Sequence, residues 1–224
     1  MKKLILWDLD GTLIDTLEDL GAAVDHALTL RGLPSPGLPA YRKMVGHGVR
    51  NLVAQALEAA SAEVGKTAGE AEAEVDAALA DFKAYYSAHI DVHTRPYEGM
   101  PELLSQLQAK GVRMAVTSNK FQEGTEHLIK EFFPDIQFVA ILGNRPGFPL
   151  KPSPEIVEEV LSKAGIGREE ALLVGDSPTD MRTAANGGIA SIAVSWGYRT
   201  PEELAGNRMA GSVTELRNLL CRKD

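Results

Sequence analysis

The stretch Leu4-Ile5-Leu6-Trp7-Asp8-Leu9-Asp10-Gly11-Thr12 joins four apolar residues directly to two carboxylates and a glycine. The apolar run has the length of a strand and no polar alternation, which is typical of a parallel sheet buried on both faces. Asp8 and Asp10 are two residues apart, so their side chains point the same way on an extended segment. Gly11 allows a tight turn and leaves backbone N–H groups able to face an anion. Helical periodicity follows instead of a second alternating strand, which argues against a simple Asp-Gly hairpin.

Short apolar runs recur along the rest of the chain and alternate with helical patterns. They comprise residues 112–116, 138–142, 171–174 and 189–194. Ser153-Pro154 and Ser177-Pro178 precede two of the helical stretches, with serine as a cap and proline in the first turn. Strands that alternate with helices predict a doubly wound α/β sheet, in which the carboxyl ends of parallel strands meet along one edge.

A block of about 80 residues interrupts this rhythm and contains no convincing strand between Leu13 and Arg95. Helical patterns occupy residues 16–31, 49–60 and a stretch that begins at a capping box of Thr67 and Glu70, and a turn-rich segment occupies residues 34–39. The predicted organisation is therefore an α/β core of residues 1–14 and 95–224, with an inserted all-helical domain of residues 15–94.

A second acidic pair, Asp176 and Asp180, follows a later strand. Asp180 could equally be a carboxylate that caps a helix, with Ser177 as the N-cap, whereas Asp176 lies at the end of the strand itself. Thr117 and Lys151 follow other strands or the loop beyond one. Taken singly, Thr117 is equally well explained as a helix cap, and Lys151 as a solvated loop lysine. Their shared position at one sheet edge favours a functional cluster.

The acidic residues at this edge pose an electrostatic problem. They are Asp8, Asp10, Asp176 and Asp180. Two carboxylates ~4 Å apart repel by ~4 kcal/mol at an effective dielectric constant of about 20, and Lys151 alone does not offset four charges. Either some carboxylates are protonated or a cation lies among them. Hard oxygen ligands favour Mg²⁺ over Zn²⁺, and the sequence has no Cys/His cluster with zinc spacing. Such a cluster with a lysine and a hydroxyl is typical of phosphoryl transfer.

Composition narrows the class of protein further. The 224 residues carry a formal net charge of -8, so nucleic acid and anionic membrane are unexpected partners. No apolar stretch approaches the ~18 residues of a membrane span, and the apolar run before Asp8 is too short for a signal peptide. Cys221 is the single cysteine, which excludes an intrachain disulfide and favours a reducing, cytoplasmic location. Charge and apolar pattern do not distinguish a monomer from a dimer.

Four segments, in order, resemble the motifs of the haloacid dehalogenase superfamily of phosphatases. They are residues 8–16 (DLDGTLIDT), 116–119 (VTSN), 151–155 (KPSPE) and 174–180 (VGDSPTD). The resemblance implies a Rossmann-like core, a Mg²⁺ cofactor and a small phosphorylated metabolite as substrate. The helical insertion after the first motif resembles the C1-type cap of this superfamily, which opens and closes over the site.

The resemblance also implies a role for each matching residue. Asp8 would be the nucleophile that forms an aspartyl phosphate, and Asp10 the general acid and base. Mg²⁺ would bind the carboxylates of Asp8 and Asp176 and the backbone carbonyl of Asp10. Lys151 and Thr117 would stabilise the phosphoryl oxygens, and Asp180 would support Lys151 or a bound water. The predicted substrate-binding residues are Gly11, Ser118, Asn119 and His47.

Within the superfamily, the phosphoglycolate phosphatase-like group is the most similar. The resemblance rests on Val45-Gly46-His47-Gly48 in the insertion, Asn119-Lys120 and Lys151-Pro152. His47 departs from the group's pattern, which has a small residue or asparagine at this position. The resemblance therefore does not identify the substrate. A sugar-phosphate mutase, a pyrophosphatase or a nucleotidase would share the four motifs. A phospho-acceptor signalling module is a further alternative, but such modules lack the helical insertion. An inactive binding protein is a third, but it would not need the complete set of acidic residues.

Overall fold

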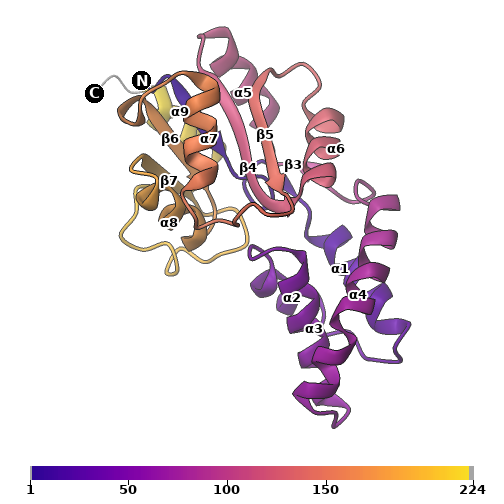
Figure 1. Ribbon diagram of the computed structural model, residues 1–224. Coiled ribbons are helices and arrows are strands. Elements are labelled where there is room, and N and C mark those ends of the chain that lie inside the picture. Colours follow the sequence, from indigo (N-terminus) through magenta and orange to yellow (C-terminus); the bar gives the residue numbers. More distant parts are fainter. Residues whose placement is uncertain (1, 222–224) are drawn as a thin grey trace. The chain divides into compact units, whose positions relative to one another are not determined.

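The computed structural model describes residues 2–221, and its contacts divide the chain into two compact units. We call Met1–Asp15 with Arg95–Asp224 the α/β unit, and Thr16–Thr94 the helical unit. Figure 1 shows the two kinds of architecture. The first boundary lies one residue beyond the predicted one, and the second lies where the sequence placed it.

The α/β unit is built on a six-stranded parallel sheet with the order β5-β4-β1-β6-β7-β8. Its strands are β1 (Leu4–Trp7), β4 (Arg113–Phe121), β5 (Phe138–Asn144), β6 (Ala171–Gly175), β7 (Ala190–Val194) and β8 (Met209–Ala210). The predicted doubly wound α/β fold is confirmed. Strand β8 was not predicted, because two residues are too few to produce a strand pattern.

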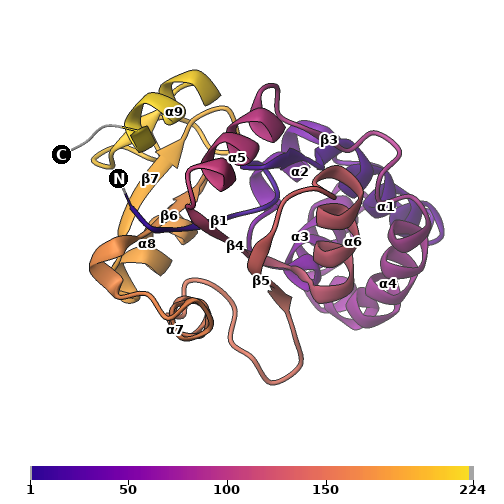
Figure 2. The same cartoon turned by 90° about the horizontal axis from the view of Figure 1, so that it is seen from above.

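Helices cover both faces of this sheet. They are α5 (Met100–Ala109), α6 (Gln122–Phe132), α7 (Glu155–Ala164), α8 (Pro178–Asn186) and α9 (Val213–Cys221), with a 3-10 turn η1 at Arg168–Glu170. Figure 2 shows α5 and α9 on one face and α7 and α8 on the other. The four side chains of β1 are at most 1% exposed, which is the two-sided burial that their continuous apolar run predicts.

The order of the strands determines where the site lies. From the central strand β1, the chain moves outward through β4 and β5 and then returns to β6, on the other side of β1. The strand order therefore reverses between β1 and β6, which pair in parallel along their length. Ligands of open α/β sheets bind beyond the carboxyl ends of the strands at such a reversal. Asp8 follows β1 and Asp176 follows β6, so the topology itself brings these two carboxylates together.

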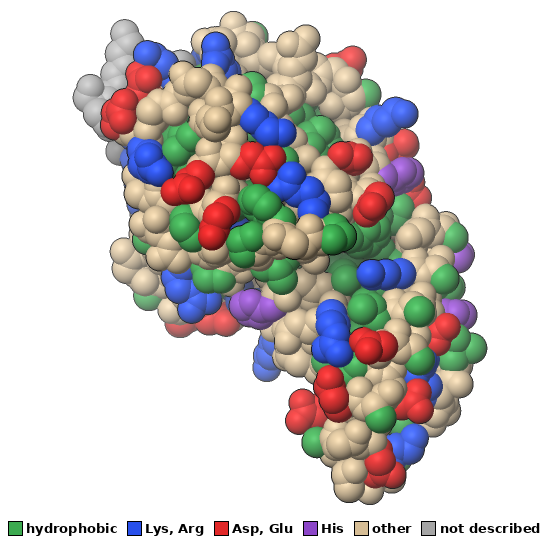
Figure 3. All heavy atoms as spheres, viewed as in Figure 1, with side chains coloured by type: hydrophobic (Ala, Val, Ile, Leu, Met, Phe, Trp, Pro, Cys, Tyr) green, Lys and Arg blue, Asp and Glu red, His purple; other side chains and the backbone are tan. Residues whose placement is uncertain are grey.

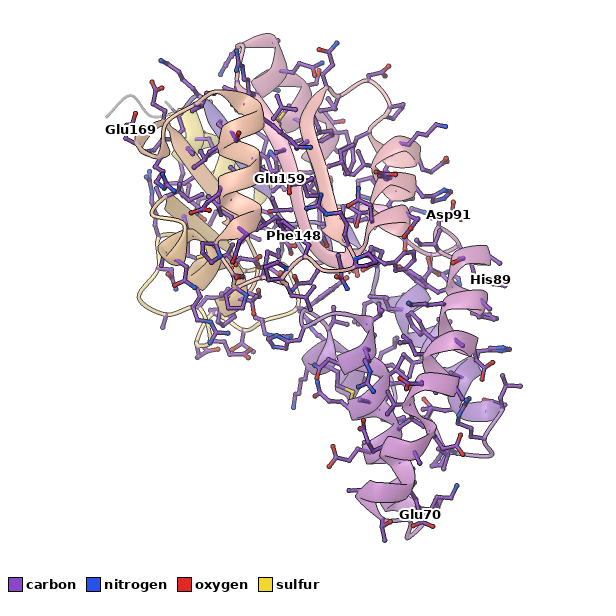
Figure 4. All side chains as sticks on the ribbon, viewed as in Figure 1. Glu70, His89, Asp91, Phe148, Glu159 and Glu169 are labelled. Atoms are coloured by element: carbon purple, nitrogen blue, oxygen red, sulfur yellow. The ribbon has the colours of Figure 1, made fainter. Side chains whose placement is uncertain are left out.

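The helical unit consists of α1 (Leu17–Thr29), α2 (Leu38–Met44), α3 (Val49–Glu63) and α4 (Ala68–Ala88). The predicted capping box is present, since the Thr67 hydroxyl accepts the N–H of Glu70 and the Glu70 carboxylate accepts the N–H of Thr67 (Figure 4). Buried Asp19 accepts N–H bonds from His93 and Thr94 at 2.8–3.0 Å and so joins the two ends of the unit's chain.

Two local predictions in this part of the chain were wrong. Helix α2 begins inside the segment predicted as turn, because its proline lies in the first turn, where a missing N–H costs no helical bond. Strand β2 (Ile14–Asp15) pairs antiparallel with β3 (Arg95–Pro96), although no strand was expected there. Two-residue strands are too short for side-chain alternation to appear in the sequence.

Surface properties add two observations. Basic and acidic side chains are interspersed on the face shown in Figure 3, which presents no extended block of one sign. Within residues 2–221, no helix combines the length and the apolar character that crossing a membrane requires.

Candidate active site

Three buried carboxylates gather at the carboxyl end of the sheet. Asp8, Asp176 and Asp180 each offer an oxygen, and these oxygens lie within 4.8 Å of one another. Gly11 has φ +85°, and a Cβ at this position would lie 2.4 Å from Asp176 Oδ2. A glycine is therefore needed both for the turn after β1 and for the close approach of β6. Its N–H donates to the Ile14 carbonyl at 2.9 Å, which differs from the expectation that this group faces an anion.

Lys151 is the cation of this cluster. Its ammonium group donates to Asp8 Oδ1 at 2.7 Å, to Asp180 Oδ1 at 2.6 Å and to the Thr117 carbonyl at 2.9 Å. The side chain is 3% exposed, so the ion pairs are formed away from water. Sequence alone could not distinguish Lys151 from a solvated loop lysine, and the structure places it inside the acidic cluster.

The loop that carries Lys151 is held by contacts from both sides. The Asn119 side chain donates to the Lys151 carbonyl at 3.1 Å and accepts the Lys151 N–H at 2.9 Å. Earlier in the loop, Arg145 pairs with Glu159 of α7 at 2.6 Å and lies 4.2 Å from the centre of the Phe148 ring (Figure 4). These contacts fix the backbone from which the Lys151 side chain projects. The predicted substrate contact of Asn119 stays a prediction.

Asp180 combines the two roles that the sequence left open. Its Oδ2 accepts the Ser177 hydroxyl at 2.6 Å and the Ser177 N–H at 3.1 Å, which completes a capping box at the start of α8. Its Oδ1 accepts Lys151. One carboxylate therefore caps the helix and orients the lysine.

Thr117 and Ser118 lie inside β4, because this strand is longer than predicted and continues to Phe121. The Thr117 hydroxyl is buried and lies 3.5 Å from the Trp7 carbonyl, at the limit of a hydrogen bond. The Ser118 hydroxyl accepts the N–H of Lys120 at 3.1 Å. The polar residues at the end of β4 stay in the strand because their side chains find buried partners.

A second buried lysine, Lys120, was not predicted as a site residue. Its ammonium group lies 3.1 Å from Asp10 Oδ1 and 3.4 Å from Oδ2. From the sequence, only Lys151 was weighed against the four carboxylates, and the structure adds Lys120. Lysine at the end of an apolar strand was the available signal, since an ammonium group in that position needs an acidic partner.

The segment after β7 also supports the site and was not predicted. The Tyr198 N–H donates to Asp176 Oδ2 at 2.6 Å, and the Trp196 indole N–H donates to the Thr12 carbonyl at 3.2 Å. The Tyr198 hydroxyl donates to Asp15 Oδ1 at 3.2 Å. These bonds connect the segment after β7 to Asp176 at the end of β6 and to the chain that follows β1. Backbone N–H groups leave no signature in a sequence, which explains why this support was missed.

Burial and mutual repulsion shift the protonation of the cluster. Burial, and then the Asp180 charge, raises the pKa of Asp8 well above its usual range, although Lys151 acts in the opposite direction. Burial and Asp180 raise the pKa of Asp176 to about 7. Burial alone would lower the pKa of Lys151, but Asp180 and Asp8 outweigh it and raise that pKa above its ordinary value. Buried carboxylates with raised pKa values are suited to a hard divalent cation such as Mg²⁺, which favours their charged forms.

Mg²⁺ is expected to stabilise the protein more at about pH 8 than at about pH 5.5. Without metal, the raised pKa of Asp176 makes the folded chain bind a proton more tightly than the unfolded chain. This contribution to stability is present below the ordinary aspartate pKa and is lost as the pH rises through about 7. Protons and Mg²⁺ therefore compete for the same oxygens. Melting temperatures with and without Mg²⁺ at both pH values measure the effect, and Asp176→Asn should abolish most of it. An equal increase at both pH values would contradict this prediction.

His47 lies in the helical unit, in the turn between α2 and α3. Its predicted contact with substrate stays a prediction.

Comparisons with known proteins identify the family. The profile of the haloacid dehalogenase-like hydrolases matches residues 5–194. Phosphoglycolate phosphatase 1 of Pseudomonas aeruginosa is 37% identical over 98% of this chain and 79% of its own length. A phosphoglycolate phosphatase of Mesorhizobium japonicum is 35% identical over 88% of this chain and 84% of its own. The crystal structure of a predicted phosphoglycolate phosphatase from Haemophilus somnus has a TM-score of 0.89, with 27% identity and 98% of each chain covered.

The chain belongs to the haloacid dehalogenase-like hydrolase family. The family and these relatives together indicate a phosphoric monoester hydrolase. The superfamily resemblance of the four motifs is thereby confirmed.

Proposed function

We propose that this protein is a Mg²⁺-dependent phosphatase that hydrolyses 2-phosphoglycolate or a similar small phosphate monoester through an aspartyl phosphate on Asp8. The observation that carries the proposal is the buried arrangement of Asp8, Lys151 and Asp180 beside Asp176. The names of the relatives from Pseudomonas aeruginosa and Mesorhizobium japonicum support the choice of substrate.

In the first half of the proposed reaction, a carboxylate oxygen of Asp8 attacks phosphorus and the bond from phosphorus to the leaving oxygen breaks. Asp10 donates a proton to the departing alkoxide. In the second half, Asp10 takes a proton from water, which attacks the same phosphorus, releases inorganic phosphate and restores Asp8. The raised pKa of Asp8 applies to the site without a metal ion, whereas attack requires the ionised carboxylate.

Charge neutralisation is the second requirement of phosphoryl transfer. Lys151 already lies 2.7 Å from Asp8, and its contact with Asp180 holds it in place. It is therefore placed to stabilise the oxygens of a phosphoryl group on Asp8. When bound, Mg²⁺ would supply a further positive charge to the phosphoryl oxygens, held by the carboxylates of Asp8 and Asp176 and the carbonyl of Asp10. The Tyr198 N–H keeps the Asp176 carboxylate oriented.

Phosphate release from a substrate panel tests the substrate. The panel comprises 2-phosphoglycolate, p-nitrophenyl phosphate, β-glucose 1-phosphate, a nucleoside monophosphate and pyrophosphate, each with Mg²⁺. We expect 2-phosphoglycolate to give the highest kcat/KM, by at least about tenfold, because a site built for one leaving group discriminates through its transition state.

The other outcomes are equally informative. Preference for a nucleotide, or for pyrophosphate, would replace the proposed substrate and leave the chemistry intact. Isomerisation of glucose 1-phosphate would point to a mutase, and a stable phosphoprotein without turnover would point to a phospho-acceptor. The cytoplasmic location and the absence of nucleic-acid and membrane partners stay predictions.

A further inference from the structure

Lys120 presents a buried charge that the proposed chemistry does not yet use. Its side chain is 0% exposed, and an ammonium group in such a place is costly unless it is paired. The group lies 3.1 and 3.4 Å from the two carboxylate oxygens of Asp10. The two contacts restrict rotation of the carboxylate, so Lys120 fixes the direction in which the Asp10 oxygens point.

The backbone of Lys120 is itself fixed in place. Its N–H donates to the Ser118 hydroxyl at 3.1 Å, and its carbonyl accepts the Thr125 hydroxyl at 3.4 Å. Strand β5 approaches so closely that a Cβ on Gly143 would lie 2.7 Å from the Lys120 carbonyl oxygen. Figure 1 shows β4, β5 and α6 side by side, and Lys120 is the second-last residue of β4. The Lys120 side chain therefore extends to Asp10 from a backbone that its neighbours hold in place.

The two lysines divide the acidic residues into two sets. Lys151 binds Asp8 and Asp180, which also belong to the carboxylate cluster with Asp176. Lys120 binds Asp10, whose side chain is 15% exposed. Lys120 is fully buried, whereas the Asp10 carboxylate keeps some exposure to solvent.

We propose that Lys120 is a positioning residue that holds the Asp10 carboxylate in the orientation needed for proton transfer to the leaving group. This inference rests on the proposed phosphatase function. It predicts that loss of Lys120 slows the step in which the leaving group is protonated. Hydrolysis of substrates whose leaving group needs no proton should change little.

The test compares an alkyl phosphate with an aryl phosphate. An alkoxide leaves poorly without a proton, whereas p-nitrophenolate is a much weaker base and leaves unaided. The ratio kcat/KM covers only the steps up to departure of the leaving group. Lys120→Met should lower kcat/KM for 2-phosphoglycolate by about 10²-fold, as expected for loss of general-acid catalysis. The loss for p-nitrophenyl phosphate should be less than about tenfold.

Two variants and a control complete the experiment. The double variant Asp10→Asn with Lys120→Met should be less than about threefold less active than Asp10→Asn alone, because the effects of groups that act as one unit are not additive. Lys120→Arg keeps the charge, so Asp10 is not left unpaired, yet moves the donor atoms; it should reproduce the preference for the aryl substrate. Lys130→Met, on the exposed surface of α6, should resemble the wild type on both substrates.

The possible failures can be told apart. Equal losses on the two substrates, or full additivity with Asp10→Asn, would overturn the assignment of Lys120 alone. A wild-type protein that hydrolyses neither substrate would overturn the proposed function and this assignment with it.

Discussion

Asp8→Asn is expected to reduce kcat by ~10⁴-fold or more while the fold is retained, because the amide cannot attack phosphorus. The substitution changes one atom, and the remaining carbonyl oxygen can still accept the hydrogen bond from Lys151, which also keeps its contact with Asp180. Binding of substrate should therefore survive better than turnover.

The same substitution should leave the thermal stability unchanged or increase it, although it lowers the activity. Burial and the neighbouring Asp180 charge raise the pKa of Asp8, so removing its charge relieves a repulsion inside the cluster. Without Mg²⁺ at about pH 8, the melting temperature of Asp8→Asn should equal or exceed that of the wild type. Asp135→Asn makes the same chemical change at an exposed position and should leave both activity and melting temperature unchanged.

Turnover and covalent labelling provide the measurement. Acid-quenched mixtures of wild-type protein with radiolabelled substrate should contain an acid-stable, base-labile phosphoprotein, and Asp8→Asn should contain none. Wild-type turnover by the variant, or labelling of the variant at the same level, would disprove the covalent role of Asp8.

Lys151→Met is expected to impair both activity and stability. The ammonium group contacts Asp8 and Asp180, and its removal would leave two buried carboxylates without their shared cation. Breaking a buried ion pair by removing one partner costs ~3–5 kcal/mol. Loss of a preorganised positive charge next to the transferred group should lower kcat by about 10²–10³-fold.

The pH dependence separates this explanation from a simple packing defect. Burial raises the pKa of Asp8, so this carboxylate can take up a proton as the pH falls, and the loss in free energy of unfolding should shrink from about pH 8 to about pH 5. Urea unfolding of the wild type and of Lys151→Met at both pH values measures this loss in free energy of unfolding. Lys163→Met is a matched control, because Lys163 is half exposed and makes a surface pair with Glu159 worth at most ~0.5 kcal/mol. A Lys151→Met protein as stable as this control at pH 8 would contradict the prediction.

Much of the α/β architecture was predictable because its strands are buried on both faces and read as continuous apolar runs. The end of β4 was predicted less well, since residues 117–121 are largely polar yet belong to the strand. Their burial depends on partners far away in sequence, such as the Lys151 backbone for Asn119. Strands β2 and β3 and helix α2 were missed because very short elements and proline-rich helix starts resemble turns.

The sequence by itself determined the class of fold and the family, because the four motifs, at the ends of apolar strands or in the loop beyond one, are local patterns. It also singled out Asp8, Asp10, Asp176 and Lys151 as candidate site residues. Only the tertiary structure decided which charges meet. The order of the strands gathers Asp8 and Asp176, Lys151 joins them from a distant loop, and Asp10 pairs with Lys120 instead. Pairing between charged groups depends on distances of a few ångströms between segments more than 100 residues apart, and spacing along a single chain does not contain that information.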